Sequence, residues 1–143
     1  MDKNTQVDKT TTLKRANEIN KNTLMETLGI VFTDFGDDFV EATMPVNPRV
    51  HQPAGLLHGG ATAALAESLG SLGSFIMVGD EAAGVVGIEI NANHIRSIRE
   101  GLVTARGTLL HKGRKTHVWD IKVTDEEGRL ISVCRLTNMI LPK

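Results

Sequence analysis

The sequence lacks the cysteines of a disulfide-bonded protein and the excess positive charge of a nucleic-acid-binding protein. Cys134 is the only cysteine among 143 residues, so no disulfide can form within the chain, and a reducing compartment is expected. Sixteen lysines and arginines are balanced by 17 acidic residues, which argues against a nucleic-acid partner. Tyrosine is absent and aromatic residues make up only 3% of the chain, so a site for an aromatic ligand would have mostly aliphatic walls.

Long apolar runs and targeting segments are also missing. No stretch reads as long and apolar enough to cross a bilayer, and residues 1–12 lack the apolar run of a signal peptide. We therefore expect a cytoplasmic protein with no membrane partner. Hydrophobic residues make up 41% of the chain, enough to bury a core without a metal. We expect a disordered tail over residues 1–12 and a single domain over residues 13–143.

The periodicity of the domain predicts an α+β fold. A broken helical segment over 13–28, with a capping-box pattern from Thr23 to Glu26, ends at Gly29. One long helix over 60–78 is apolar on nearly all sides, as a helix wrapped inside a sheet should be. Short turns between the later strands indicate an antiparallel sheet. The expected strands are 30–35, 39–46, 85–94, 102–110, 116–124 and 130–140, with a loop over 47–57.

The long helix contains a single carboxylate, Glu67, among small and apolar residues. Burying one carboxylate costs on the order of several kcal/mol unless it is paired or hydrogen-bonded. The glycine pair Gly59-Gly60 opens the helix, where unpaired N–H groups carry a partial positive charge. Such a helix start can stabilise the developing negative charge of a carbonyl oxygen, while Glu67 attacks the carbonyl or takes a proton from water.

The spacing of these two groups predicts an assembly. Gly59 and Glu67 are eight residues apart, or about 12 Å along a helix. One carbonyl cannot touch both groups of the same helix. If both act on one substrate, they come from two subunits whose helices pair antiparallel, so we expect a dimer with composite sites.

Each of these residues also has an ordinary structural explanation. A glycine pair before a helix often makes only a tight turn, and a lone glutamate can form an ion pair at a dimer interface. His58 alone would be a structural histidine bonded to backbone, and Gln52 a loop residue. Their occurrence together is what favours a site.

The joint pattern resembles a known family. The motif Q-P-x-G-x-x-H-G-G from Gln52 onward, followed by A-E-S-x-G-S, is similar to hotdog-fold acyl-CoA thioesterases. The nearest branch holds the 1,4-dihydroxy-2-naphthoyl-CoA hydrolases and the enterobactin-pathway proofreading thioesterases, within the wider phenylacetate-type and 4-hydroxybenzoyl-CoA group. The resemblance runs from about Gly29 to Ile140 and includes the segments 86–94 and 116–119. It implies a hotdog fold, a curved antiparallel sheet around one long helix.

The resemblance also implies roles for particular residues. Glu67 would be the nucleophile or general base toward a thioester carbonyl, and Gly59 would supply the N–H of the oxyanion hole. His58 and Gln52 would place the thioester, and Ser71 would hold the attacking water. The family takes the glutamate and the glycine from different subunits, commonly forms tetramers from two dimers, and needs no metal or other cofactor. The substrate class it implies is an acyl-CoA, most plausibly an aromatic one.

The same resemblance implies where coenzyme A lies. One of the implied segments, residues 111–116, also reads as a basic hairpin turn with free N–H groups, which is suited to phosphates, although an ordinary solvated turn has the same pattern. The expected CoA-binding residues are Gly87, His94, Ile95, Arg96 and Ser97, together with His111, Lys112, Gly113, Arg114, Lys115 and Thr116.

Other chemistries fit the sequence less well. Gly70-Ser71-Leu72-Gly73 is not the G-x-S-x-G of serine hydrolases, and Cys134 has no local partner for nucleophilic catalysis. The five histidines show no metal-ligand spacing, so no metal site is expected. A hotdog dehydratase or hydratase, a non-catalytic acyl-CoA binding module, and a hydrolase of acyl-carrier-protein or medium-chain aliphatic thioesters stay open as alternatives.

Overall fold

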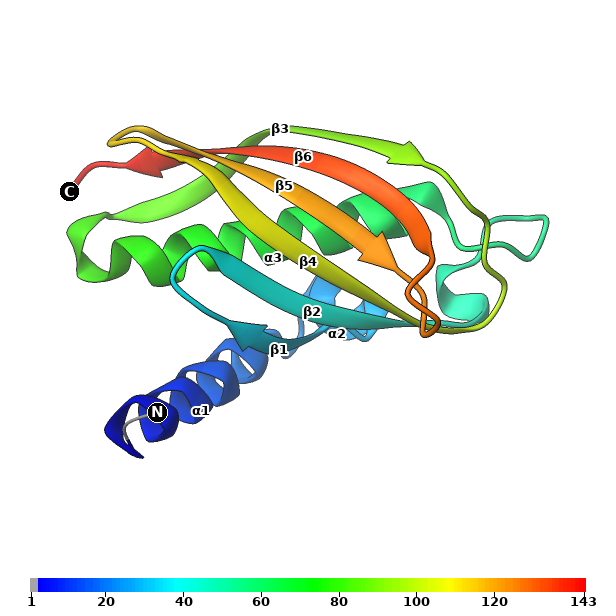
Figure 1. Ribbon diagram of the computed structural model, residues 1–143, viewed down its shortest axis with the longest axis horizontal. Coiled ribbons are helices and arrows are strands. Elements are labelled where there is room, and N and C mark those ends of the chain that lie inside the picture. The colour runs from blue at the N-terminus through cyan, green and yellow to red at the C-terminus, as the bar shows by residue number, and fades with distance from the viewer. Residues whose placement is uncertain (1–2) are drawn as a thin grey trace.

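The computed structural model describes residues 3–143, with side chains from Asp8 onward. One antiparallel sheet curves over one face of the long helix α3 (Gly59–Val78), and the remaining helices lie below it (Figure 1). The sheet has six strands in the order β1-β2-β4-β5-β6-β3. The strands are β1 (Val31–Phe35), β2 (Phe39–Val46), β3 (Gly84–His94), β4 (Gly101–Lys112), β5 (Thr116–Thr124) and β6 (Leu130–Leu141). The helices besides α3 are α1 (Lys3–Glu18), α2 (Leu24–Leu28), and the 3-10 turns η1 (Pro48–Val50) and η2 (Gly79–Glu81).

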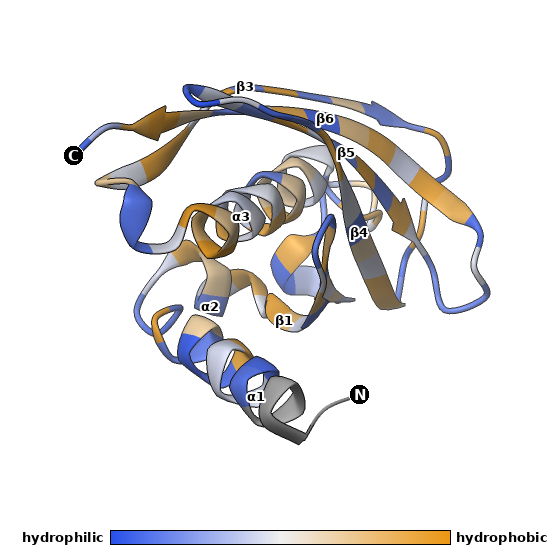
Figure 2. Cartoon of the chain, turned by 60° about the vertical axis from the view of Figure 1, so that its left-hand side comes forward, coloured by the Kyte–Doolittle hydropathy of each residue, from blue (hydrophilic) through white to orange (hydrophobic). Residues whose placement is uncertain are grey.

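The core lies between α3 and the concave face of the sheet. Leu65 and Leu69 of α3 are fully buried against sheet residues such as Met44 and Trp119, and Figure 2 shows the hydrophobic colouring of the strands around the helix. Helix and sheet approach closely at Gly73, where a β-carbon would come within 2.7 Å of the Trp119 ring. In β2, buried and half-buried residues alternate along the strand, as its sequence pattern predicts.

The other face of α3 is only partly covered by residues 3–143. A stripe at helical spacing is half-buried or exposed, and Phe75 on it is 54% exposed. The helix is therefore wrapped by sheet on one side only, which corrects the expectation of burial all round. The stripe consists of Ala63, Ala64, Glu67, Ser68, Ser71 and Phe75.

By length and composition, the segment Gly59–Glu81 could cross a bilayer, which corrects the expectation that no stretch is apolar enough. Its mean hydropathy is high because Glu67 is the only charged residue of α3. In the structure 44% of the most apolar 18-residue window of that segment is buried, and the helix packs against the sheet, as a core helix does.

Helix α1 replaces the disordered tail expected over residues 1–12, of which residues 1–2 lie outside the described chain. Few of its side chains are apolar, so composition gave no indication of order. Ala16 is buried in the core, and polar contacts add to this packing: Lys9 pairs with Asp34 and lies 5.5 Å from the centre of the Phe35 ring. Further along, the Asn17 amide both donates to and accepts from the Phe32 backbone, at 2.9 Å each.

The predicted capping box of helix α2 does not form, because Glu26 bonds to the residue before the N-cap Thr23 instead of to Thr23 itself. The Thr23 side chain makes no capping bond, whereas Glu26 Oε2 accepts from the backbone N–H of Asn22 at 2.7 Å. Gly29 ends the helix as predicted, with a φ of 73° that favours glycine.

Candidate active site

A pocket of about 260 Å³ lies at the N-terminal end of α3, and we call it the Gly59 pocket. The loop after η1 contributes Gln52 to it, α3 contributes Gly59, and the end of β3 contributes His94. Ile95, Arg96 and Ser97 continue the lining from the segment after β3. The structure thus brings together residues that the resemblance assigned separately to thioester placement, the oxyanion hole and CoA binding.

Gly59 presents a free backbone N–H to this pocket. The next three N–H groups of α3 are all used by His58: Nδ1 of its ring accepts from Gly60 at 2.8 Å, and its carbonyl accepts from Ala61 and Thr62 at 3.0 and 3.3 Å. Within residues 3–143, no acceptor is bonded to the Gly59 N–H. A donor at the positive end of a 20-residue helix is suited to stabilising an oxyanion.

His58 is therefore the N-cap of α3, and its exposed ring lines a neighbouring pocket with His51 and Gly60 rather than the Gly59 pocket. Because Nδ1 accepts a hydrogen bond, a neutral His58 carries its proton on Nε2. The ring thus caps the start of α3, next to the Gly59 pocket.

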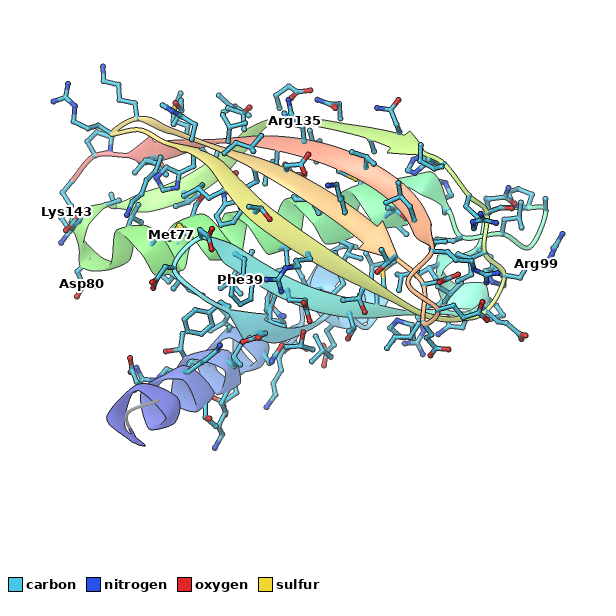
Figure 3. The ribbon with its side chains drawn as sticks, viewed as in Figure 1. Phe39, Met77, Asp80, Arg99, Arg135 and Lys143 are labelled. Atoms are coloured by element: carbon cyan, nitrogen blue, oxygen red, sulfur yellow. The ribbon has the colours of Figure 1, made fainter. Side chains whose placement is uncertain are left out.

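The loop that carries Gln52 is fastened to the segment that follows β3. His51 Nε2 donates to the carbonyl of Arg99 at 2.7 Å, and the Leu57 N–H donates to Ile98 O at 2.8 Å. Gln52 Oε1 accepts from the Ala54 N–H, which leaves the Gln52 amide N–H groups free for a ligand. Arg99 marks this end of the molecule in Figure 3.

His94 lies directly over Gly59, a position that its sequence gave no reason to expect. A β-carbon at position 59 would come within 2.5 Å of His94 Nε2. His94 Nδ1 is 3.1 Å from Ser132 Oγ, and the Ser132 hydroxyl donates its hydrogen to Asn93 O. His94 Nδ1 is then the donor to Ser132, so Nε2 of the neutral ring is an acceptor, and it lies next to the Cα atom of Gly59.

Glu67 lies two helical turns further along α3 with its carboxylate against Gly87 of β3. The residue is half-buried, less enclosed than its apolar helix suggested. Across residues 3–143, no hydrogen bond or ion pair holds the Glu67 carboxylate, so it is available to a substrate or to water. Gly59 and Glu67 of one chain therefore lie at separate places along α3, as their spacing of eight residues predicts.

Ser71 follows Glu67 by one turn on the same half-buried stripe. Its hydroxyl lies 3.5 Å from Oδ1 of Asn138, on β6. Gly87, opposite Asn138 in the β3–β6 register, sits next to a bulge in β3. The Glu67 side of the site is therefore built from α3, β3 and β6.

The predicted basic turn lies at the other end of α3. Lys112, Gly113 and Arg114 line a pocket of about 320 Å³ with Met77 and His117, which we call the Lys112 pocket. The sequence suggested free N–H groups in this turn, but the Gly113 N–H is bonded to Thr116 O at 2.8 Å, which corrects that expectation. His111, Arg114 and Lys115 are exposed, and Thr116 is half-buried at the start of β5.

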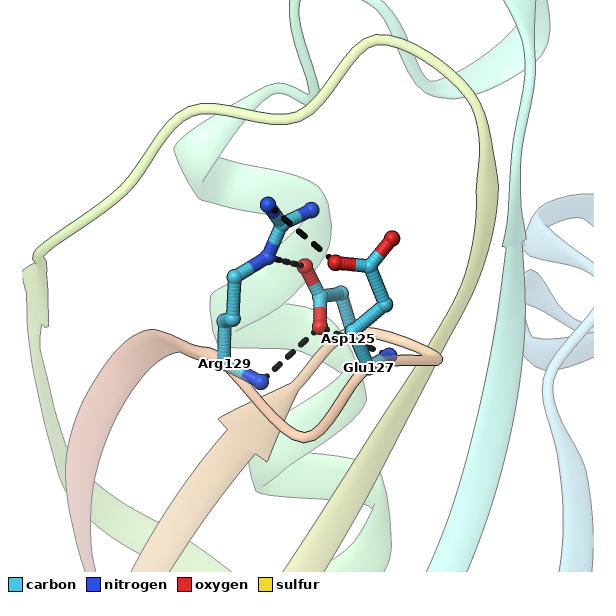
Figure 4. Close-up of polar contacts among 3 residues, drawn as sticks. All are labelled: Asp125, Glu127 and Arg129. Carbon is cyan, nitrogen blue, oxygen red and sulfur yellow. Dashed lines mark hydrogen bonds and ion pairs between the residues drawn. The ribbon is translucent and has the colours of Figure 1, made fainter.

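A larger pocket of about 360 Å³ near the β5–β6 turn has structural rather than catalytic carboxylates. Asp125 is buried there; burial acts to raise the pKa of its carboxyl, but hydrogen bonds from Arg129 and from the Glu127 backbone hold that pKa below its usual value. Figure 4 shows the carboxylate occupied by these donors. It has no free side to offer a substrate.

Comparison with known proteins decides the family. The model of the thioesterase superfamily matches residues 54–132, more than half of the chain. The chain belongs to the thioesterase superfamily. Among curated relatives of this superfamily member, "Putative esterase PA1618" of Pseudomonas aeruginosa is 47% identical over 130 residues, 91% of this chain and 90% of that protein.

Solved structures agree with this membership of the thioesterase superfamily. A mutant of thioesterase PA1618 from Pseudomonas aeruginosa has a TM-score of 0.88 and 46% identity, over 92% of this chain and 94% of that one. Thioesterase HI1161 from Haemophilus influenzae has a TM-score of 0.87 and 45% identity, over 91% and 90%. The predicted hotdog fold and thioester hydrolase class are confirmed.

Proposed function

We propose that this thioesterase hydrolyses aromatic acyl-CoA thioesters at a site shared by two subunits. The observation that carries the proposal is the separation on one helix of a free Gly59 N–H and an unpaired Glu67 carboxylate. A thioester needs both a donor for its carbonyl oxygen and a base or nucleophile for its carbonyl carbon. A second α3 running antiparallel would bring the partner's Gly59 beside Glu67.

The difference between the two edges of the sheet supports a dimer that forms through β3. The β1 edge is covered by α1, because the Asn17 amide occupies the Phe32 backbone groups. The β3 edge is open, and Val86 and Ile88 on it are 43% and 52% exposed. Pairing of two β3 edges would also cover the half-buried stripe of α3 that carries Glu67 and Ser71.

The same pairing accounts for the separation of the CoA-binding residues. The Gly59 and Lys112 pockets lie at opposite ends of α3, about 30 Å apart along 20 residues. Antiparallel helices place the Lys112 end of one subunit toward the Gly59 end of its partner. Lys112 and Arg114 would then meet the phosphates of a CoA whose thioester lies in the shared site, with Arg96 as a further cation.

In the proposed reaction, Glu67 takes a proton from a water molecule held by Ser71, and the water oxygen attacks the thioester carbon. The partner's Gly59 N–H bonds to the carbonyl oxygen as it gains negative charge. When the C–S bond breaks, the CoA thiolate recovers the proton from Glu67. Direct attack by Glu67 is the alternative: it would expel the CoA thiolate and form a mixed anhydride, and water attack on the Glu67 carbonyl carbon of that anhydride would leave ¹⁸O in the Glu67 carboxylate after single turnovers in H₂¹⁸O.

A panel of thioesters tests the proposal. Purified protein is offered benzoyl-CoA, 1,4-dihydroxy-2-naphthoyl-CoA, octanoyl-CoA and the same acyl groups on an acyl carrier protein, with released thiol as the readout. We expect the highest kcat/KM on an aromatic acyl-CoA, in keeping with the aliphatic side chains Leu56, Leu57 and Ile131 around the Gly59 pocket. Preference for octanoyl-CoA or for carrier-protein thioesters would contradict the proposed aromatic acyl-CoA substrate. If the protein slowed the hydrolysis of every thioester, it would be a binding module.

A further inference from the structure

A buried polar network connects Ser71 to the interior of the protein. Ser74, His117, Trp119 and Asn138 are all at most 1% exposed, and they meet on the sheet-facing side of α3 one turn beyond Ser71. Trp119 Nε1 and Asn138 Nδ2 each lie 2.9 Å from Ser74 Oγ, and His117 Nδ1 lies 3.0 Å from the same atom. Polar groups so deeply buried need partners, and here each one has at least one.

The donors and acceptors of this network can be assigned without ambiguity. Trp119 Nε1 can only donate, so Ser74 Oγ accepts from it. Gly70 O can only accept, and the Asn138 amide atom 3.1 Å from it is therefore the nitrogen. Ser74 Oγ accepts from that nitrogen as well, so its own hydrogen goes to Nδ1 of His117.

This assignment determines what Asn138 presents to Ser71. Its nitrogen is committed to Gly70 O and Ser74 Oγ, so the oxygen, Oδ1, faces the Ser71 hydroxyl at 3.5 Å. An amide oxygen can only accept a hydrogen bond. Ser71 is therefore the donor to Asn138, and the lone pairs of Ser71 Oγ remain available to accept a hydrogen bond.

We propose that Asn138 is a positioning residue for thioester hydrolysis, which makes Ser71 an acceptor of a hydrogen bond from the attacking water. This rests on the proposed function above. One hydrogen of the water would go to the Glu67 carboxylate and the other would bond to Ser71 Oγ, which turns a lone pair of the water oxygen toward the carbonyl carbon. Asn138 lies opposite Gly87 in the register, and Gly87 contacts Glu67, so one strand position borders both groups that hold the water.

A double-mutant cycle tests this on the preferred thioester of the panel. Ser71→Ala and Asn138→Leu are each expected to lower kcat by about tenfold with KM changed by less than about twofold, as for loss of one positioning hydrogen bond. The double variant should be no slower than Ser71→Ala alone, because Asn138 acts only through Ser71. Independent, multiplying losses would overturn the proposal, as would an unimpaired Ser71→Ala.

Ser74→Ala is the matched control for general destabilisation. It leaves Trp119 and His117 without their shared partner, so its melting temperature should fall at least as far as that of Asn138→Leu. Gly70 O still fixes the Asn138 amide, so kcat should stay within about twofold of wild type. A loss of kcat equal to that of Asn138→Leu would overturn the positioning role.

Two further arms keep the result interpretable. Asn138→Ser, whose hydroxyl is too short to span from Gly70 O to Ser71, replaces Asn138→Leu in the cycle if that variant does not fold. Glu67→Gln is measured in parallel. If this variant hydrolyses the thioester normally, the proposed function fails. If it is inactive but the losses of Ser71→Ala and Asn138→Leu multiply in the double variant, only the role of Asn138 is refuted.

Discussion

The Glu67 carboxylate lies against the Cα atom of Gly87, which is next to an irregularity in the register of β3. A methyl group at position 87 would overlap Glu67 Oε1. Gly87 does not have a positive φ, so backbone conformation does not require glycine at this position. The absence of a side chain instead leaves room for the Glu67 carboxylate. A residue that the resemblance assigned to CoA binding thus also determines where the Glu67 carboxylate can lie.

Gly87→Ala should impair catalysis while leaving the fold intact. The group it displaces is the end of a flexible side chain, so the carboxylate shifts and the backbone does not. We expect kcat to fall by about 10- to 100-fold, as for an ångström-scale misplacement of a catalytic group. Gly84→Ala on the same strand is the control, because its methyl group would meet only Leu141 at 3.7 Å. Equal activity of the two variants in steady-state assays would refute this geometry.

Activity should return when two different inactive variants share a dimer. Glu67→Ala lacks the base, and Gly59→Val forces a side chain into the His94 ring. Random mixing after co-refolding makes half of the dimers mixed, each with one intact composite site of two, so about a quarter of wild-type activity is expected. Mixed dimers demonstrated by two affinity tags but without activity would show that each site belongs to a single chain.

Stability should decline in mildly acidic solution because of His117. Burial, with the nearby charges of Lys112 and His111, holds its pKa below the usual 6.5. The unfolded chain therefore binds the proton first, and the free energy of unfolding falls as the pH drops below 6.5. His117→Gln should flatten this slope in urea titrations between pH 6.5 and 5. An unchanged slope would exclude His117 as the cause.

The carboxyl groups of Asp34 and Asp125 titrate at lower pH than His117. Lys9 holds the pKa of Asp34 below 3.8, and the pKa of Asp125 also lies below that value. Their contribution to stability is present above pH 3.8 and is lost only at lower pH, so it does not obscure the effect of His117.

Much of the fold could be predicted because its elements follow from short-range patterns. Alternation in β2, the glycine at position 29 and the turns of the later hairpins are local features. The order of α1 could not be predicted, since it depends on contacts of Lys9 and Asn17 with β1 that only the folded chain provides.

The residues of the candidate site also fall into a group that local sequence predicts and a group that only the folded chain brings together. Glu67, Gly59 and Gln52 lie within one motif, and the spacing of Gly59 and Glu67 along the helix already predicted a site shared by two subunits. His94 beside Gly59 depends on Ser132, 38 residues away, and Asn138 reaches Ser71 across 67 residues. No local pattern marks such pairs, so their roles emerged only from the structure.

Hydrolysis by Glu67→Gln tests the central claim most directly. The substitution keeps the size of the side chain and removes its charge, and the space beside Gly87 can hold either group. We predict that kcat on the preferred acyl-CoA falls by about 10²- to 10⁴-fold, the usual contribution of a general base, while substrate binding and melting temperature stay near wild type. A kcat within about tenfold of wild type would contradict the account, because Glu67 could not then be the group that drives hydrolysis.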